Sequence, residues 1–351
     1  MSSHEFDPNA AAVPGSGIFG LPFAPEEAAL VLVPVPWEAT TSYGGGTSEG
    51  PAAILDASKQ VDLFDLELPS AFRAGIAMLP EQDDFHVWND EAKHLAAQII
   101  EAGGAQADDP ELGRALERVN ELSARVNEAV AALADEWLDA GKVVGVIGGD
   151  HSCPLGAIQA AARRTSELGI LHLDAHSDTR KAYEGFTYSH ASIMENVLRL
   201  VPQVTSLVQV GIRDFCQEEF DRMSAHRDRL HVFFDASLAE ARFTGTPWGR
   251  LVDGMIHELP QDVWLSFDID GLDPSLCPHT GTPVPGGLSF QETCFLIRAV
   301  ARSGRRIVGF DLCEVAPGDG PEEWDANVGA RLLYKMAIWT LASHGKAEAG
   351  S

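Results

Sequence analysis

The chain has 351 residues, of which 45% are hydrophobic, and its formal net charge is −27. That charge argues against nucleic acids and anionic membranes as partners, because both are bound through basic patches. The five cysteines are widely spaced without a CxxC pair, and neither a secretory signal nor a membrane-length apolar run is visible. We therefore expect a cytoplasmic protein with reduced thiols.

The first part of the chain is poor in periodic structure. Residues 1–27 are polar and punctuated by Gly and Pro, which predicts an N-terminal arm that is flexible or contacts a neighbouring subunit. Residues 29–35 form an apolar run typical of a buried strand. A Gly-rich loop follows over 37–51, without a phosphate-binding pattern. A helix is predicted over 51–59, with Pro51 in its first turn.

Strands then alternate with helices to the end of the chain. This order predicts a parallel sheet covered by helices on both faces. Helical spacing is visible over 91–101, 112–140, 155–163 and 325–342, and a capping box at Ser289 and Glu292 opens a helix that ends near 302. The predicted strands cover 143–147, 170–173, 206–210, 263–267 and 306–310.

Three runs rich in Asp and His follow predicted strands, namely 148–152 (GGDHS), 174–178 (DAHSD) and 268–270 (DID). Alternate residues of an extended chain point to one face, and open parallel sheets place their sites at these strand ends. Four carboxylates and two imidazoles in one pocket would need cations to offset their repulsion. The sequence therefore predicts a centre of two divalent metals.

Each run also has a purely structural interpretation. In the first run, Asp150 or Ser152 can cap the next helix, and a lone His151 is more often structural than a ligand. The run 174–178 is the stronger signal, because burying two unpaired carboxylates would be costly. Its alternative is a polar loop with a helix-capping Asp. Asp273, which precedes a proline, is interpreted as a turn residue.

Together, GGDHS, DAHSD and SFDIDGLDP, in this order, resemble the signatures of the ureohydrolase family, which includes arginase and agmatinase. The resemblance covers roughly residues 31–342. It implies one domain over residues 28–345, an α/β/α sandwich around a mostly parallel sheet of about eight strands. It also implies six ligands for two metals: His151, Asp174, Asp178 and Asp268 would hold one ion, and His176, Asp174, Asp268 and Asp270 the other, with Asp174 and Asp268 bridging.

The same resemblance implies three catalytic residues. Glu314 follows a predicted strand, where a carboxylate can pair with a planar guanidinium. Asp178 would hold a proton of the attacking water, and His190 would shuttle protons. The reaction implied is hydrolysis of a guanidino group, with release of urea plus ammonia or an amine.

The substrate is predicted from the loop before His190. Arginases carry a Ser-Gly-Asn run there, whereas this chain has YEGFTYS over 183–189, which argues against arginine. Tyr183, Phe186 and Tyr188 could wall a small pocket and offer ring faces to a cation, or could simply pack the loop onto the body. The loop is similar to the guanidine hydrolase branch, including hydrolases of alkylated guanidines and of biguanides such as metformin. A compact guanidine ranks first, and agmatine or guanidinobutyrate next.

The donor set and the resemblance also suggest the cofactor and the partners. A carboxylate-rich site suits Mn²⁺ by hardness, whereas the branch resemblance points to Ni²⁺ and to a nickel chaperone. We expect a homo-oligomer, a trimer or hexamer, or a heteromer with a related subunit. Two other classes compete with this enzyme: a non-catalytic metal-binding subunit of such a heteromer, and a histone-deacetylase-like amidohydrolase with one zinc.

Overall fold

The computed structural model describes residues 6–13, 15–41, 43–104, 109–318 and 323–347. In this part of the chain, eight strands form one sheet in the order β2-β1-β3-β8-β7-β4-β5-β6, and every neighbouring pair is parallel. The strands are β1 (Leu30–Val35), β2 (Ile76–Met78), β3 (Val143–Gly148), β4 (Leu168–Leu173), β5 (Val204–Ile212), β6 (Leu230–Phe234), β7 (Asp262–Asp268) and β8 (Arg306–Cys313).

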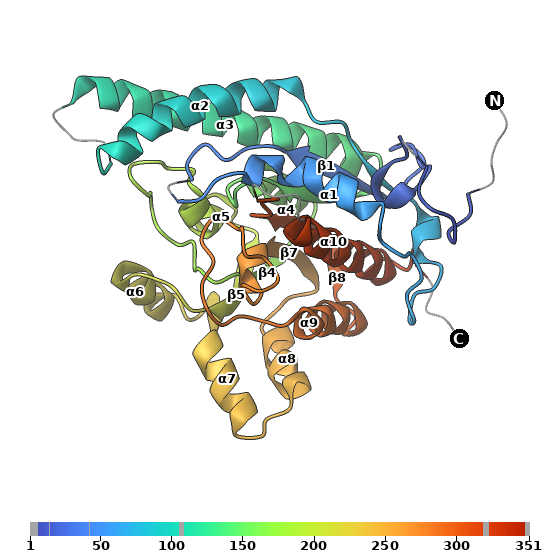
Figure 1. Ribbon diagram of the computed structural model, residues 1–351. Coiled ribbons are helices and arrows are strands. Elements are labelled where there is room, and N and C mark those ends of the chain that lie inside the picture. Colours follow the sequence, from blue (N-terminus) through green and yellow to red (C-terminus); the bar gives the residue numbers. More distant parts are fainter. Residues whose placement is uncertain (1–5, 14, 42, 105–108, 319–322, 348–351) are drawn as a thin grey trace.

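Helices cover both faces of the sheet (Figure 1), as predicted. The helices are α1 (Gly50–Ser58), α2 (Asp83–Glu101), α3 (Pro110–Asp139), α4 (Leu155–Ala162), α5 (Ile193–Leu200), α6 (Gln217–Ala225), α7 (Asp235–Phe243), α8 (Trp248–His257), α9 (Phe290–Arg302) and α10 (Trp324–Ser343). Helices α3, α4 and α5 pack against one face, with α2 against α3, while α1, α8, α9 and α10 supply the core of the other. None of the described helices is long and apolar enough to cross a membrane.

Several elements differ from the prediction. Helix α2 begins at Asp83, eight residues before the predicted start, and carries Asp83 and Asp84 in its first turn, where carboxylates complement the helix dipole. Strands β2 and β6 and helices α5 to α8 were not predicted. Strand β2 has only three residues, and the five residues of the edge strand β6 are interrupted by His231, so both apolar runs are too short to identify a strand.

The N-terminal arm is partly built into the domain. Residues 1–5 lie outside the described residues. Ile18, Phe19 and Leu21 are buried in the core, and the Phe19 ring meets Tyr334 of α10 edge-on at 5.1 Å between centroids. The prediction of a flexible or subunit-contacting arm is therefore wrong for residues 18–21, whose apolar side chains pack on the chain's own core.

The strand order explains why the acid-rich runs meet. Strands β3, β8, β7 and β4 are consecutive neighbours in the sheet. His151 follows β3 by three residues, Glu314 follows β8, Asp268 ends β7, and Asp174 follows β4. Because parallel strands end at one edge, these four side chains are delivered to the same place.

Candidate metal centre

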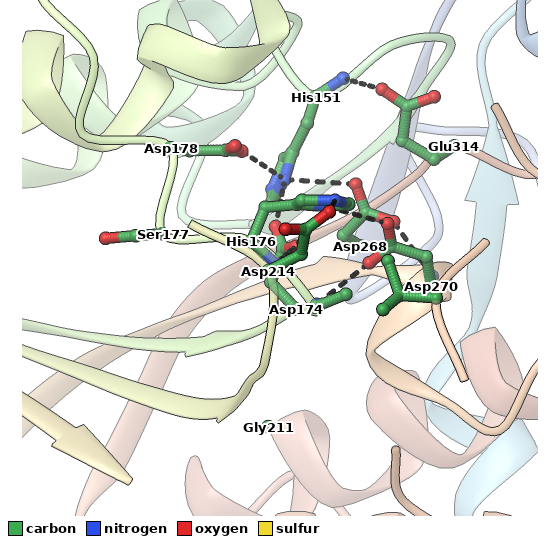
Figure 2. Close-up of polar contacts among 12 residues, drawn as sticks. His151, Asp174, His176, Ser177, Asp178, Gly211, Asp214, Asp268, Asp270 and Glu314 are labelled. Atoms are coloured by element: carbon green, nitrogen blue, oxygen red, sulfur yellow. Dashed lines mark hydrogen bonds and ion pairs between the residues drawn. The ribbon is translucent and has the colours of Figure 1, made fainter. Parts of the chain in front are cut away.

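Three carboxylates lie close to one imidazole nitrogen, that of His151. The Nδ1 atom of His151 lies 3.1 Å from Oδ2 of Asp174 and 3.5 Å from Oδ2 of both Asp178 and Asp268. All four side chains are buried. Figure 2 shows Asp174, Asp178 and Asp268 gathered around the His151 ring. The predicted ligands of the first metal therefore converge around one point.

A second cluster shares one residue with the first. The Nδ1 atom of His176 lies 3.0 Å from Oδ2 of Asp270 and 3.5 Å from Oδ1 of Asp174. Asp174 thus faces the two clusters with different oxygens, which is the arrangement of a bridging carboxylate. Asp268 contacts the first cluster through Oδ2, and its Oδ1 accepts a hydrogen bond from the backbone N–H of Asp270. Its bridging role stays a prediction.

The charges of the clusters fit cations. Burial, together with the charge of Asp174, raises the pKa of Asp178 to about 6, and burial raises the pKa of Asp268 well above its usual range. Burial lowers the pKa of His176, but the neighbouring Asp270 and Asp174 outweigh it and raise that pKa to about 12. In the metal-free protein, protons bound to these groups therefore offset part of the clustered negative charge. The oxygen and imidazole donors match those that divalent Mn²⁺ or Ni²⁺ accept, so the residues fit two such ions.

Two of the site residues have strained backbones. Asp178 and Glu314 adopt φ angles of 54° and 64°, in the left-handed region that non-glycine residues rarely enter. Such strain costs about 1 kcal/mol per residue and persists only where the surrounding structure enforces it. In Glu314 it is enforced by two backbone hydrogen bonds, from its N–H to the carbonyl of Gly149 and from the Thr280 hydroxyl to its own carbonyl.

Glu314 borders a cavity of about 150 Å³ above the clusters. Its Oε1 accepts a hydrogen bond from the backbone N–H of His151 at 2.9 Å. Burial and the charge of Asp150 raise the pKa of Glu314 well above its usual range. His176, Asp178 and Asp268 line the same cavity, so it joins Glu314 to both clusters.

His190 and Tyr183 also line this cavity, but Phe186 and Tyr188 do not. Phe186 is fully buried in a small core cluster with residues of α2 and α3, and Tyr188 packs against the main core. The prediction that they wall the substrate pocket is wrong, and loop packing explains both. The ring of Tyr183 is covered by the Arg180 guanidinium, 5.0 Å from its centroid.

A buried network behind the clusters was not predicted. The Nε2 atom of His151 lies 2.9 Å from the Ser266 hydroxyl, which donates to Asp311. The Nε2 atom of His172 lies 2.8 Å from the carboxylate Oδ2 of Asp174, and its Nδ1 lies 2.9 Å from Nε2 of Gln209. These residues lie within apolar strands. A single polar residue in an apolar run was therefore the only feature of the sequence that could have indicated this network.

The glycines of the first motif serve packing. A Cβ at Gly149 would lie 2.1 Å from the carbonyl oxygen of Trp37, and one at Gly148 would lie 2.5 Å from the Sγ of Cys313. Their lack of side chains lets the turn after β3 fit against its neighbours.

Comparison with known proteins gives consistent results. A family model described as the arginase family matches residues 28–339. The chain is 32% identical over 318 residues to N(1)-aminopropylagmatine ureohydrolase from Synechocystis, covering 89% of this chain and 90% of that protein. It is 34% identical to the enzyme of the same name from Thermus thermophilus, with 92% and 93% covered. The structure of proclavaminate amidino hydrolase from Streptomyces clavuligerus superposes with a TM-score of 0.72 at 24% identity, covering 95% of this chain and all of that one, which supports the fold.

Proposed function

Because the chain belongs to the arginase family, a family of hydrolases that cleave guanidino C–N bonds, we propose that it hydrolyses a small guanidine other than arginine with two divalent metal ions. The products are urea and ammonia or an amine. The observation that carries the proposal is Asp174, whose two oxygens face two separate His/Asp clusters directly below a cavity bordered by Glu314.

The metal residues divide between the two ions. His151, Asp174, Asp178 and Asp268 would hold one ion, and His176, Asp174, Asp268 and Asp270 the other. When bound, the ions supply a water acidified to near neutral pH as the nucleophile. The carboxylate-rich donor set favours Mn²⁺, and the likeness to guanidine hydrolases favours Ni²⁺.

Glu314 binds and orients the guanidinium. Its raised pKa reflects a buried carboxylate without enough positive charge nearby, so a cationic substrate would stabilise its ionised form. Paired hydrogen bonds from the planar guanidinium would fix the carbon above the clusters.

Asp178 and His190 handle protons. Asp178 has a pKa of about 6 in the protein alone and would accept the water's proton once the cations are present. Burial and the positive charge of His176 lower the pKa of His190 to about 4, so it is neutral near pH 7 and can take up and pass on a proton.

The cavity supports a compact substrate. Its volume of about 150 Å³ suits guanidine or a short alkylguanidine. Arg180 and Tyr183 both line the cavity, and the Arg180 guanidinium would repel a second positive charge on the substrate. It also covers one face of the Tyr183 ring, so a substrate cation cannot bind to that face.

A second candidate, hydrolysis of agmatine or an N-substituted agmatine, is favoured by the sequence relatives. One residue on the cavity wall suits it: Asp214, whose side chain is 68% exposed, could meet a distal amine. A guanidino acid would instead pair with Arg180. A non-catalytic subunit is disfavoured, because Glu314 and all six predicted metal ligands are present.

A urea-release screen tests the proposal. The protein is loaded with Ni²⁺ or Mn²⁺ and offered guanidine, methylguanidine, metformin, agmatine, guanidinobutyrate and arginine. We expect the highest kcat/KM for guanidine or one of its small alkyl derivatives, and none for arginine. A preference for agmatine would establish the second candidate instead. Silence toward every compound by the metal-loaded protein would contradict a catalytic role.

A further inference from the structure

A buried histidine beside the first cluster has two possible roles. His172 lies on β4 with no exposed surface, and its Nε2 is 2.8 Å from Oδ2 of Asp174. It belongs to a group of potential metal-binding atoms together with His151 and Asp178. Distance alone leaves it either a further metal ligand or a hydrogen-bond donor to Asp174.

The neighbouring strand decides between these roles. Gln209 of β5 is the register partner of His172, so the two side chains project to the same face of the sheet. The Nε2 atom of Gln209 lies 2.7 Å from the Ser177 carbonyl oxygen, which can only accept. The Ser177 hydroxyl donates to Oε1 of Gln209 at 2.9 Å. Both contacts fix the orientation of the amide.

The amide orientation then fixes the imidazole. The Nε2 atom of Gln209 also lies 2.9 Å from Nδ1 of His172. Because an amide nitrogen can only donate, Nδ1 is the acceptor of its second hydrogen. The proton of the neutral ring is therefore on Nε2, which donates to Oδ2 of Asp174. Nε2 could coordinate a metal only if the proton of the ring moved to Nδ1, where the Gln209 amide already donates.

We propose that Gln209 is a positioning residue that fixes the Nε2–H tautomer of His172, and that His172 orients Asp174 as a donor and is not a metal ligand. Asp174 is the carboxylate shared by both clusters, and its Oδ1 is held independently by the backbone N–H of His176 at 2.6 Å. The two donors together set the plane of the shared carboxylate. This inference deepens the proposed function and rests on its metal centre.

Metal affinity provides the first test. Metal-free protein is titrated with Mn²⁺ or Ni²⁺ against a competing chelator. Loss of such an outer hydrogen bond typically weakens metal binding about 10- to 100-fold. We expect Gln209→Met to show at least a tenfold loss. The matched control is Ser206→Ala, which removes a hydrogen bond from the same strand to the Glu258 carbonyl, far from the clusters, and should keep wild-type affinity. Equal affinities of Gln209→Met and wild type would overturn the proposal.

Stoichiometry separates donor from ligand. His172→Phe should still bind two ions per chain, more weakly, and His172→Gln should recover part of the affinity because its amide can donate to Asp174. A drop to one ion per chain in His172→Phe would make His172 a ligand and overturn the assignment.

The tautomer is measurable without any variant of Gln209. In metal-free wild-type protein labelled with ¹⁵N-histidine, the His172 signals, assigned by their absence from His172→Phe, should show a protonated Nε2 and an unprotonated Nδ1. A neutral ring with its proton on Nδ1 would overturn the proposal. Wild-type protein that binds no metal would refute the proposed function. If the wild-type protein binds two ions and releases urea, and the Gln209 variants bind metal as tightly as the wild type, only this inference is refuted.

Discussion

Asp174 links the two halves of the centre, because its Oδ2 lies beside His151 and its Oδ1 beside His176. Residues that belong to one half alone should therefore behave differently from Asp174 when replaced. Asp270 is such a residue, since its side chain contacts His176 and the backbone N–H of Ala175.

Asp270→Ala should reduce bound metal from two ions to one per chain and abolish urea release, because the second cluster loses a buried carboxylate. Metal analysis after gel filtration measures the first effect and a urea assay the second. Asp273→Ala is the matched control: that carboxylate accepts from the backbone N–H of Ser275 in a nearby turn, so the variant should keep both ions. Two ions with full turnover in Asp270→Ala would contradict its assignment.

Glu314→Gln should retain two ions but lose turnover. The amide keeps an oxygen for the backbone N–H of His151 and loses the charge that pairs with the guanidinium. Replacing the charge-assisted hydrogen bonds to the guanidinium by neutral ones should raise the activation free energy by about 3 kcal/mol, which is roughly a 100-fold loss of kcat/KM. Steady-state kinetics at fixed metal content measure it, and an unchanged kcat/KM would remove Glu314 from substrate binding.

Metal affinity should depend on pH through Asp178 and His176. In the metal-free protein Asp178 has a pKa of about 6, so below that pH a metal ion must displace its proton. His176 has a pKa of about 12, so a metal ion must displace its proton throughout the neutral range. Below about pH 6 the plot of log affinity against pH should therefore become steeper. The extra proton should lower the affinity by a further factor of roughly ten for each pH unit. Chelator competition between pH 5 and 8 measures it. A constant slope through pH 6 would show that Asp178 is already ionised.

The residue types of the centre could be predicted because Asp and His at alternate positions have few other uses at strand ends. His172, Gln209 and Asp311 could not, since each lies alone in an apolar strand, where a structural explanation is equally good. Phe186 was misassigned because an aromatic residue in a loop looks the same in sequence whether it faces a pocket or the core.

At the scale of elements, the central strands were predictable and the edges were not. Strands β1, β3, β7 and β8 are buried along nearly their whole length and so give continuous apolar runs. The half-buried edge strand β6 has no such run. The start of α1 was predicted from Pro51 and that of α9 from its capping box, signals that act locally. Helix α3 was predicted from helical spacing alone, and α2 begins in a polar stretch.

The Gly-rich loop after β1 is held by one buried carboxylate. Glu38 is 2% exposed, and its Oε2 accepts from the backbone N–H groups of Gly46 and Ser48. Its Oε1 pairs with Lys93 of α2. The loop packs tightly beyond this anchor: a Cβ at Gly44 would lie 2.8 Å from the carbonyl oxygen of Gly281, and a Cβ at Gly281 would lie 3.4 Å from Oε2 of Glu314. Glu38 therefore fixes a loop that lies close to Glu314.

Lys93→Met should lower the free energy of unfolding by about 1–2 kcal/mol, because it leaves the buried Glu38 without its cation. Lys59→Met is the matched control. Lys59 pairs with Asp56, whose side chain is 76% exposed, so its loss should change stability by less than about 0.5 kcal/mol. Denaturant unfolding of the metal-free proteins measures both. Equal effects would show that the Lys93–Glu38 pair does not anchor the loop.

For the whole molecule, the α/β/α architecture could be predicted because the order of strands and helices allows few other arrangements. The cavity could not, since its wall joins segments distant in sequence, among them Arg180, Asp214 and Thr282. No local pattern records how such loops meet. This is why the reaction class was predictable and the choice of guanidine was not.

Metal removal should destabilise the whole domain, because both clusters join strands from across the sheet. At a free metal concentration of about 100 times Kd, each ion would add about 2.7 kcal/mol to the free energy of unfolding. Calorimetry should show a Tm several degrees lower after chelation, and about half that shift in Asp270→Ala. An identical Tm with and without chelator would mean that the clusters bind no metal under those conditions.

The most direct test of a two-metal guanidine hydrolase is urea release measured against the number of ions bound per chain. Metal-free protein is loaded stepwise with Ni²⁺ or Mn²⁺ and assayed with guanidine and its small alkyl derivatives. The arrangement of Asp174 between two clusters predicts that activity rises until two ions are bound and then stays constant. A plateau at one ion, or no urea at any loading, would contradict it.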